Sequence, residues 1–499
     1  MKSGWKSSKR ICNDMKSHLI SLSLCIVLAA CSCGGKDPVE PGNEQPVETT
    51  TGDVTAYITT ADKSKAFVTD DKIAFAAETS AGGIQVTPDR YQTVQGFGTA
   101  ISQATCYNLL RMSQEDRTKF LTEIFSRKEG LGSSLIRVCI GGSDFSLDEF
   151  TWCDKEGMDH FEVHDSDKRY LFPILDEIFA INPDMKIIAS PWSCPRWMKR
   201  APDSEADFNS WTSGRLKPAC YADYALYFVK WIQEMESRGY PIYAITVQNE
   251  PLNKGNSMSM YMSWQEQRDF IKTALGPAFE KAGIKTRILL YDHNYDQSSY
   301  PLNILKDADA AKYAAGTAWH SYGGSVSVLD NVFSSFPDKE IYFTEASIGT
   351  WNHQNFSDNF TADFREEFIG VLMRGGSGSV LWNLMLDKDG KPYRPGGCST
   401  CYGAVTIGPT YSYNTIVRNT HYYFVAQCSK VIQPGAVRIG TSGSVPADIL
   451  HAAFRNPDGS YAWVVLNQGS SPAYLTFTSG HTFQYNIPAR SIVSFTWKD

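Results

Sequence analysis

The sequence predicts an α/β fold, a (β/α)8 TIM barrel with an appended all-β sandwich. Between residues 94 and 426, eight short apolar segments alternate with segments of helical spacing, which is the pattern of a parallel barrel. After about Gln427 the helical spacing stops, and short segments of alternating apolar and polar residues follow. Polar and aromatic residues stand at the expected carboxyl ends of the barrel strands, where this fold carries its functional groups.

The composition is that of a large globular protein. The chain has 499 residues, of which 42% are hydrophobic and 20% are charged, so it can form two or three domains. A net charge of −7 gives no reason to expect a nucleic-acid partner. The aromatic content is high, at 13%, with 12 Trp and 25 Tyr. Either a large aromatic core or a cleft in which aromatic faces stack on sugars explains it.

The first residues have the pattern of a targeting segment. A basic start is followed by an apolar run, Leu19 to Ala30, that is too short for a comfortable transmembrane helix. The run ends Leu28-Ala29-Ala30-Cys31, which resembles the lipobox of bacterial lipoproteins. That resemblance implies lipidation of Cys31, export, and a lipid anchor on the cell envelope (outer membrane or periplasm) as the only membrane contact. Secretory cleavage near Ala30 without a lipid is the alternative.

The composition also divides the chain. The expected parts are a signal peptide at 1–30, a flexible tether at 31–53, strands at 54–93 that join the sandwich, the barrel at 94–426 and the sandwich at 427–499. Among the 12 Cys, only Cys398-Ser-Thr-Cys401 forms a C-x-x-C pair, and no second pair completes a zinc site. A loop disulfide is one expectation for it; redox activity is less favoured in such Gly-rich surroundings.

The elements follow in order. Segments 55–60 and 72–76 alternate as strands, and Ser113 to Asp116 has the form of a capping box that opens a helix ending at Phe125. A second helix has buried-face spacing from Tyr224 to Met235 and stops at Gly239. The expected barrel strands are 94–97, 135–139, 186–190, 243–247, 287–292, 317–320, 341–345 and 380–384, and the sandwich strands include 461–466, 474–478 and 491–497.

Two of these strands end in a glutamate. Segment 243–247 is followed by Gln248-Asn249-Glu250-Pro251, and Pro251 forces Glu250 out of helical geometry. Segment 341–345 ends at Glu345. A lone strand-end Glu can cap a helix or pair with an Arg, but strands four and seven face each other across a barrel mouth. Carboxyl groups about 5–5.5 Å apart are typical of retaining glycosidases, and about 6.5–9.5 Å of inverting ones.

The chain resembles glycoside hydrolase family 30, which includes glucosylceramidases and β-1,6-glucanases. The resemblance runs from about residue 94 to the C-terminus. Its motifs are V-Q-G-F-G-T-A (94–100), R-V-C-I-G-G-S-D-F-S (137–146), A-S-P-W-S-C-P-R-W-M-K (189–199), V-Q-N-E-P (247–251), W-H-S-Y (319–322), F-T-E-A (343–346) and L-W-N-L (381–384). No G-x-G-x-x-G motif follows Val94, so nucleotide binding is not supported.

The resemblance implies roles for eight residues. Glu250 matches the acid/base, Glu345 the nucleophile and Asn249 the residue that holds the sugar 2-hydroxyl. Five further residues match family residues that bind the sugar in the −1 subsite or line that subsite: Asp144, Trp192, His320, Tyr322 and Trp382. The alternatives are that Trp192 and Trp382 are barrel-top core and that His320 is structural. Arg137 is expected to hold a carboxylate, and Trp351 is a possible platform on the aglycone side.

These roles imply a retaining β-glycoside hydrolase that acts on β-linked glucosides, and we predict a β-1,6-glucanase. Glucosylceramidase or another β-glucosidase or β-fucosidase is the alternative within the family; a non-catalytic glycan-binding lipoprotein is the alternative from another class. Gln103 and the loop 396–401 depart from the glucosylceramidase pattern. The expected partner is a β-glucan or glucoside, with no nucleic acid, no metal and no organic cofactor. No oligomeric state is predicted.

Overall fold

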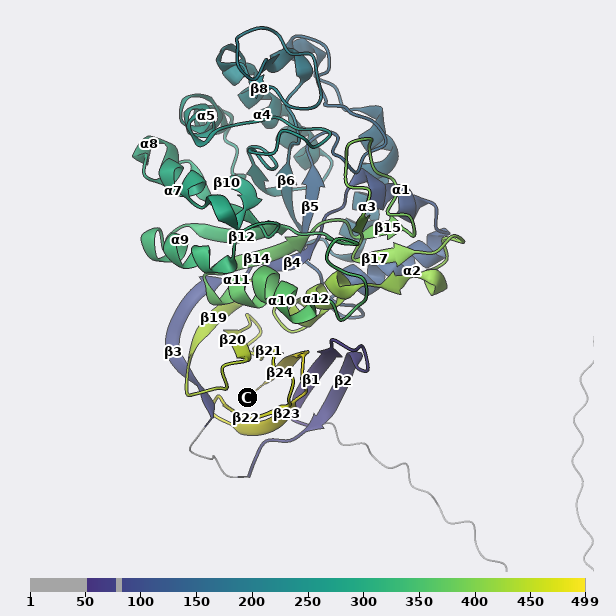
Figure 1. Cartoon of the computed structure of the whole chain (residues 1–499), viewed down its shortest axis with the longest axis vertical. Helices are drawn as coiled ribbons and strands as arrows, with labels where there is room; N and C mark the ends of the chain where they lie inside the picture. Colours follow the sequence, from purple (N-terminus) through teal and green to yellow (C-terminus); the bar gives the residue numbers. More distant parts are fainter. Residues whose placement is uncertain (1–51, 78–82, 499) are drawn as a thin grey trace, which may run out of the picture. The chain divides into compact units, whose positions relative to one another are not determined.

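The computed structural model describes residues 52–77 and 83–498 (Figure 1). The predicted signal peptide, the lipidation site Cys31 and nearly all of the predicted tether lie outside these residues. Within the described ranges, no helix combines the length and the apolar character needed to cross a bilayer.

The barrel is a ring of eight parallel strands, as predicted. They are β4 (Gly96–Thr99), β5 (Leu135–Cys139), β6 (Lys186–Ser190), β9 (Ile242–Thr246), β10 (Arg287–Asn294), β11 (Ala314–His320), β12 (Glu340–Glu345) and β14 (Gly376–Leu381). Their order in the sheet is β4-β14-β12-β11-β10-β9-β6-β5, and a parallel bridge between Ala100 and Arg137 joins the two ends. Inward-facing side chains such as Leu135, Ile188 and Tyr342 pack together inside the ring, so the barrel is a filled core.

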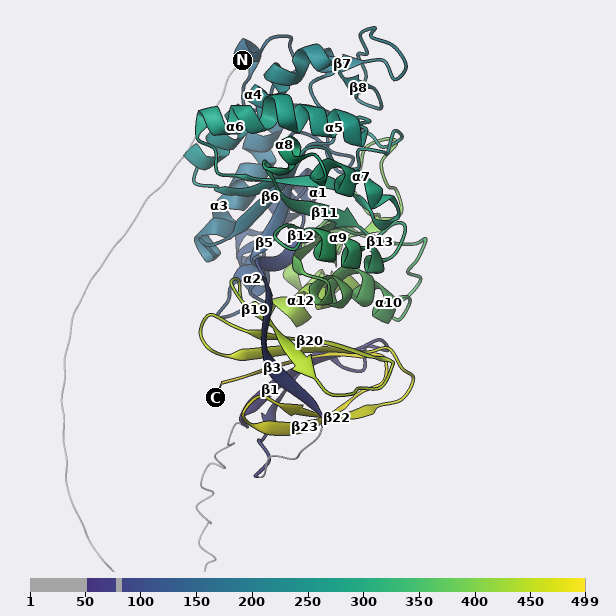
Figure 2. The same cartoon turned by 90° about the vertical axis from the view of Figure 1, so that its left-hand side faces the viewer.

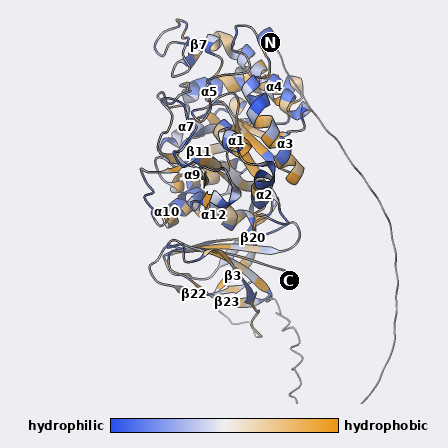
Figure 3. Cartoon of the chain, turned by 90° about the vertical axis from the view of Figure 1, so that its right-hand side faces the viewer, coloured by the Kyte–Doolittle hydropathy of each residue, from blue (hydrophilic) through white to orange (hydrophobic). Residues whose placement is uncertain are grey.

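The helices lie outside this ring (Figure 1; Figure 2). They are α1 (Gln103–Leu110), α2 (Gln114–Phe125), α3 (Phe172–Ile181), α4 (Tyr221–Ser237), α5 (Trp264–Phe270), α6 (Gly276–Ala282), α7 (Ser299–Leu305), α8 (Ala308–Ala311), α9 (Leu329–Ser335), α10 (Phe360–Phe364), α11 (Gly370–Met373) and α12 (Thr420–Ser429). Hydrophobic and hydrophilic residues occupy different parts of α3 and α4 (Figure 3), because one side of each helix packs on the strands.

Two helix ends show the local chemistry that the sequence predicts. At the start of α2, the Ser113 hydroxyl accepts the backbone N–H of Asp116 at 3.1 Å, which is one of the two hydrogen bonds of the predicted capping box. After α4 the chain turns through Gly239 at φ 91°, a conformation that glycine adopts without steric penalty.

The sandwich is one nine-stranded sheet folded over its own apolar side. Its strands are β1 (Val54–Thr60), β2 (Ala66–Ile73), β3 (Ile84–Thr93), β19 (Val437–Ser442), β20 (Ile449–Arg455), β21 (Tyr461–Asn467), β22 (Ala473–Thr478), β23 (Thr482–Ile487) and β24 (Ser491–Trp497). The order is β2-β1-β24-β21-β20-β19-β3-β22-β23, so the early strands join the C-terminal ones, as predicted. The two edges meet where the Tyr485 hydroxyl donates to Asp70 at 3.2 Å.

Side-chain amides bond the sandwich to the barrel. The Gln427 amide on α12 lies between the hydroxyls of Thr59 on β1 and Ser494 on β24, at 2.8 and 2.6 Å. The Gln92 amide on β3 donates to the carbonyls of Leu372 and Gly376, at 2.6 and 3.1 Å. These bonds attach the sandwich to α11, to α12 and to the amino end of β14.

Candidate active site

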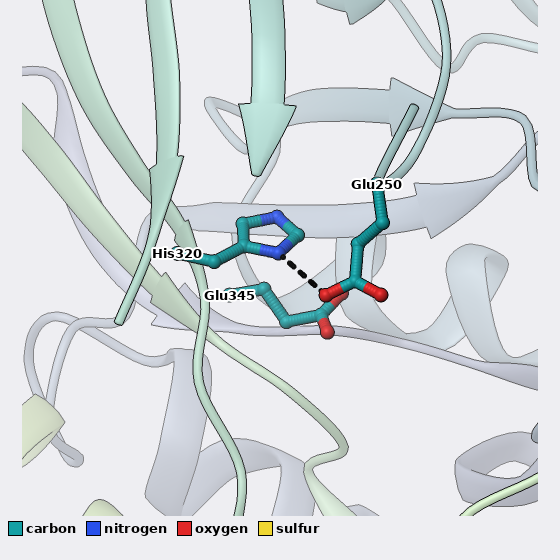
Figure 4. A group of neighbouring side chains, drawn as sticks. All are labelled: Glu250, His320 and Glu345. Carbon is teal, nitrogen blue, oxygen red and sulfur yellow. Dashed lines mark hydrogen bonds and ion pairs between the residues drawn. The ribbon is translucent and has the colours of Figure 1, made fainter. Parts of the chain in front are cut away.

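Glu250 and Glu345 meet at the carboxyl ends of the barrel strands. Glu250 follows β9, and Glu345 is the last residue of β12. One carboxylate oxygen of each glutamate and one ring nitrogen of His320 all lie within 4.8 Å of one another (Figure 4). The structure therefore brings together the two glutamates that the sequence singles out, at the close spacing typical of retaining rather than inverting glycosidases.

The backbone at this site is in an unusual conformation. Glu250 has φ 44°, and Tyr291 and Asp292 at the end of β10 have φ 78° and 68°. Non-glycine residues seldom adopt positive φ, and such strain concentrates at functional sites. The N–H of Glu250 donates to the carbonyl of Asp292 at 3.0 Å, so two of these residues are tied to each other.

Glu345 is held by two donors. Arg137 Nη1 donates to Oε2 at 2.5 Å, and the Tyr322 hydroxyl donates to Oε1 at 3.1 Å. Arg137 thus holds a carboxylate, as predicted. Burial nevertheless raises the pKa of Glu345, and the negative charges of Glu250 and Asp292 add to it, against the opposing charges of His320 and Arg137.

Glu250 is surrounded by imidazoles and an amide. Its Oε1 lies 3.3 Å from His320 Nδ1 and 4.0 Å from His293 Nε2, and Asn253 donates to its Oε2 at 2.8 Å. Burial raises the pKa of Glu250, but the hydrogen bond and charge of His320, followed by His293 and Asn253, lower it to about 2. For His320 the signs are reversed. Burial lowers the pKa of its imidazole, but the charge of Glu345 and the contacts with Asp292 and Glu250 raise that pKa to about 9.

This charge pattern differs from the one that the resemblance implies, in which Glu250 carries the proton. His320 Nδ1 lies 3.3 Å from Glu250 Oε1, so a proton on the imidazole is within hydrogen-bonding reach of the carboxylate that is expected to use it. Glu345 faces a guanidinium and a hydroxyl, which suits an anion, and Glu250 faces a source of a proton.

Glu250, His320 and Glu345 are residue types that ligate metals, and they form the one such close group in the described ranges. They do not fit that use here. His320 Nδ1 lies 3.3 Å from Glu250 Oε1 and Nε2 lies 3.0 Å from Asp292 Oδ1, so each ring nitrogen contacts a carboxylate. A doubly protonated imidazole has no lone pair for a metal ion. The group is instead an alternating set of positive and negative charges.

Asp292 is the residue at this site that sequence reasoning missed. It is fully buried on β10 and accepts hydrogen bonds from side chains of five other strands. Its donors are Arg137, Ser190, Thr246, His320 and Thr344. The available signal was its position, because a carboxylate ends the predicted strand 287–292 just as glutamates end two others.

A cleft of about 390 Å³ opens above the two glutamates. Three of the predicted substrate-binding residues line it: Asp144, Tyr322 and Trp382. The other three, Trp192, Asn249 and His320, are buried behind its wall. Further lining residues that sequence reasoning did not single out are Phe145, Asn253, Asn256, His293, Asn294 and Ser347.

The two tryptophans form a stacked pair. The rings of Trp192 and Trp382 lie 5.0 Å apart at 29°, and the Arg137 guanidinium lies 5.0 and 5.6 Å from them. Trp382 faces the cleft, whereas Trp192 packs beneath it. Of the two roles that the sequence left open, Trp382 therefore has the cleft-lining role and Trp192 has the core role.

Asp144 lines the cleft and is itself buried. Burial, followed by the charges of Glu345 and Glu250, raises the pKa of Asp144 to about 8. Its carbonyl accepts the N–H of Arg394 at 2.6 Å, and a side chain at Gly397 would collide with it. A neutral Asp144 carboxyl can both donate and accept a hydrogen bond, which suits a sugar hydroxyl.

The cleft wall also carries the C-x-x-C pair, in the loop that contacts Asp144 through Gly397. Cys398 and Cys401 form a disulfide, and both line the cleft together with Trp351, which is 49% exposed. Strand β16 (Cys401–Tyr402) pairs with β13 (Ile348–Gly349), which follows Glu345 in the chain. The disulfide loop is thus attached to the segment that follows Glu345.

Known proteins share both parts of this architecture. The model of the glycosyl hydrolase family 30 TIM-barrel domain matches residues 94–432, and that of the family 30 β-sandwich domain matches residues 435–495. The chain belongs to glycosyl hydrolase family 30. It is therefore a glycoside hydrolase, and Glu250 and Glu345 lie at the site where a TIM barrel carries its chemistry.

Relatives of this family 30 chain extend over most of its length. The endo-1,6-β-D-glucanase BGN16.3 of Trichoderma harzianum is 35% identical over 431 residues, covering 81% of this chain and 84% of its own. Lysosomal acid glucosylceramidase of Mus musculus is 26% identical over 450 residues, covering 85% of each. The solved structure of the endo-β-1,6-glucanase BT3312 has 47% identity and a TM-score of 0.87, over 90% of this chain and 100% of that one.

Proposed function

We propose that this family 30 glycoside hydrolase is a retaining endo-β-1,6-glucanase. The observation that carries the proposal is the 47% identity with an endo-β-1,6-glucanase over that chain's whole length. The pair of glutamates, with one oxygen of each within 4.8 Å of the other, agrees with it. The glucosylceramidase relatives share less identity, at 26–29%. Glucosylceramidase activity is therefore the second candidate.

In the first step of the proposed mechanism, Glu345 attacks the anomeric carbon of the glucose in the −1 subsite. The glycosidic C–O bond breaks as Glu250 transfers a proton to the leaving oxygen. The product is a glycosyl ester of Glu345. Arg137 and Tyr322, which donate to the two oxygens of Glu345, position this carboxylate for attack.

In the second step, the carboxylate of Glu250 takes a proton from water, and the water oxygen attacks the same carbon from the side opposite Glu345. The ester bond breaks, Glu345 returns as a carboxylate and Glu250 is protonated again. Two inversions retain the β configuration. Trp382 and Asp144, which line the cleft, are placed to contact the sugar ring and its hydroxyls.

Hydrolysis of four substrates in parallel tests the proposal: β-1,6-glucan, β-1,3-glucan, xylan and glucosylceramide. We expect oligosaccharides from β-1,6-glucan, with the β anomer formed first by NMR, and no turnover by Glu345→Gln. Glucose from glucosylceramide alone would select the second candidate. Binding of β-1,6-glucan without turnover of any substrate would support the glycan-binding alternative instead.

We also propose that the protein is an exported lipoprotein of a bacterial envelope. The basic start, the apolar run and Leu28-Ala29-Ala30-Cys31 support this. Labelled palmitate should be incorporated by the wild-type chain and not by Cys31→Ala. An unlabelled product that begins just after Ala30 would favour secretory cleavage.

A further inference from the structure

Asp292 connects the two predicted catalytic glutamates. Its side chain is fully buried, and its two oxygens together accept five hydrogen bonds. Two donors are cationic: Arg137 Nη2 at 2.8 Å and His320 Nε2 at 3.0 Å. Each of these cations also contacts one of the two glutamates, Arg137 contacting Glu345 and His320 contacting Glu250.

The contacts form one chain of alternating charge from Glu250 through His320, Asp292 and Arg137 to Glu345. Each contact in it is between 2.5 and 3.3 Å long. Three carboxylates and two cations leave one negative charge in excess, so a single added proton neutralises the set. Water is excluded from its centre, where Arg137, His320 and Asp292 are all fully buried, so each charge is strongly felt by the next.

Three hydroxyls fix the charge of Asp292 itself. Thr246 and Thr344 donate at 2.6 Å each, and Ser190 donates at 3.0 Å. Burial raises the pKa of Asp292, but the charge of Arg137 and the hydrogen bonds from His320 and Thr246 hold it far below its usual range. Asp292 is therefore a permanent anion placed between two cations.

We propose that Asp292 is a positioning residue that sets where the catalytic proton resides, acting on Glu250 through His320 and on Glu345 through Arg137. This inference rests on the proposed two-glutamate mechanism. Asp292 is fully buried and does not line the cleft. Its negative charge keeps a proton on His320 within reach of Glu250, and it orients the guanidinium that holds Glu345.

The expected pH dependence follows from the charged and titratable groups around Asp292. They are Arg137 on β5, Glu250 after β9, His293 on β10, His320 on β11 and Glu345 on β12. The low-pH limb of activity reports ionisation of Glu345, and the high-pH limb reports loss of the proton shared by Glu250 and His320. The negative charge of Asp292 raises the pKa of Glu345 and the pKa of the Glu250–His320 pair. Removing the charge of Asp292 therefore lowers both pKa values.

Asp292→Asn tests this, because it removes the charge and nearly preserves the shape. We expect both limbs of the kcat/KM profile on β-1,6-glucan to move to lower pH by roughly 1 unit or more. A residue with only a structural role would lower activity at every pH without moving the limbs. Asp167→Asn is the matched control, since Asp167 is also buried but is bonded to Trp152 Nε1, at 2.7 Å.

If Asp292→Asn does not fold, the wild-type protein provides the test. In ¹⁵N-histidine NMR spectra, one of the nine histidines, identified by its absence in His320→Asn, should stay protonated to about pH 9. A neutral His320 at pH 7, or unmoved limbs in folded Asp292→Asn, would overturn the inference. Turnover by Glu345→Gln equal to wild type would instead overturn the proposed function.

Discussion

The backbone N–H of Glu250 donates to the backbone carbonyl of Asp292 at 3.0 Å, and both residues have positive φ. The turn that ends β9 is thereby locked to the end of β10. This hydrogen bond helps to hold the backbone of Glu250 at its unusual φ beside Glu345. The two residues with positive φ, at the ends of neighbouring strands, are thus joined by one backbone hydrogen bond.

Replacing Glu250 should separate the two chemical steps. We expect Glu250→Gln to lose about 10²–10⁴-fold in kcat/KM on β-1,6-glucan, because a sugar alkoxide leaves only with a proton. On an aryl β-glucoside with an acidic phenol as leaving group, the first step needs no acid. A burst of phenol followed by slow turnover is therefore expected in stopped-flow measurements.

Glu345→Gln provides the contrast, since it should show no burst on either substrate. Equal losses of Glu250→Gln on both substrates would contradict its assignment as the acid/base. A burst from Glu345→Gln would reverse the two roles. Wild-type circular dichroism spectra for both variants would exclude misfolding as the cause.

Arg137→Lys tests the geometry of the charged chain. One guanidinium donates to Glu345, Asn249 and Asp292, at 2.5, 2.8 and 2.8 Å. A lysine ammonium keeps the charge but cannot match this planar arrangement. We expect kcat to fall by roughly 10²-fold with little change in KM, because Arg137 is fully buried and does not line the cleft. An unchanged kcat would show that charge alone suffices.

The strand ends were predictable, whereas the orientation of their side chains was not. Short apolar runs bounded by polar residues predict the barrel strands and place Glu250 and Glu345 at one end of the sheet. Asn249 and His320 lie behind the cleft wall because of the strand register and the positive φ at Glu250. Neither of these can be read from the periodicity of the sequence. Asp292 was overlooked because no motif marks a carboxylate that acts through other residues.

The cleft wall formed by long loops was less predictable still. Trp351 and the disulfide pair Cys398 and Cys401 come together only through the pairing of β13 with β16. Nothing in the local pattern of either loop specifies that pairing. The sequence comparison did indicate that residues 396–401 depart from the glucosylceramidase pattern, which is consistent with a wall that differs between branches of the family.

Trp351 should bind sugar units beyond the −1 subsite. Its ring is half exposed beside the cleft, whereas Trp382 is buried at its base. We expect Trp351→Ala to lower kcat/KM on β-1,6-glucan about 10-fold, the loss of roughly 1.4 kcal/mol of stacking. Activity on an aryl β-glucoside should stay within about 2-fold, since that substrate fills few subsites.

Tyr474→Ala is the control for that experiment, because Tyr474 is another exposed aromatic residue, at 66%, but lies on β22 of the sandwich. It should leave both activities unchanged. Equal losses on polymer and aryl glucoside in Trp351→Ala would place the ring at the reacting sugar instead. Replacing Cys398 and Cys401 by serine should resemble Trp351→Ala, because the disulfide loop forms the same wall.

The buried carboxyl of Asp167 should make the free energy of unfolding depend on pH. This carboxyl is 4% exposed, and burial raises its pKa to about 7, against the lowering effect of its hydrogen bond from Trp152. Between pH 4 and 7 the folded state therefore binds more protons than the unfolded state. The free energy of unfolding then falls as pH rises through this window and levels off above pH 7.

Asp167→Asn removes this term, because an amide is neutral at every pH and its oxygen can still accept from Trp152 Nε1. At pH 4 the variant and wild type should unfold at similar urea concentrations. At pH 8 the variant should be more stable by roughly 1–4 kcal/mol, since it no longer has to bury an ionised carboxylate. A variant that is less stable than wild type at pH 8 would show that the charge of Asp167 is compensated by its surroundings.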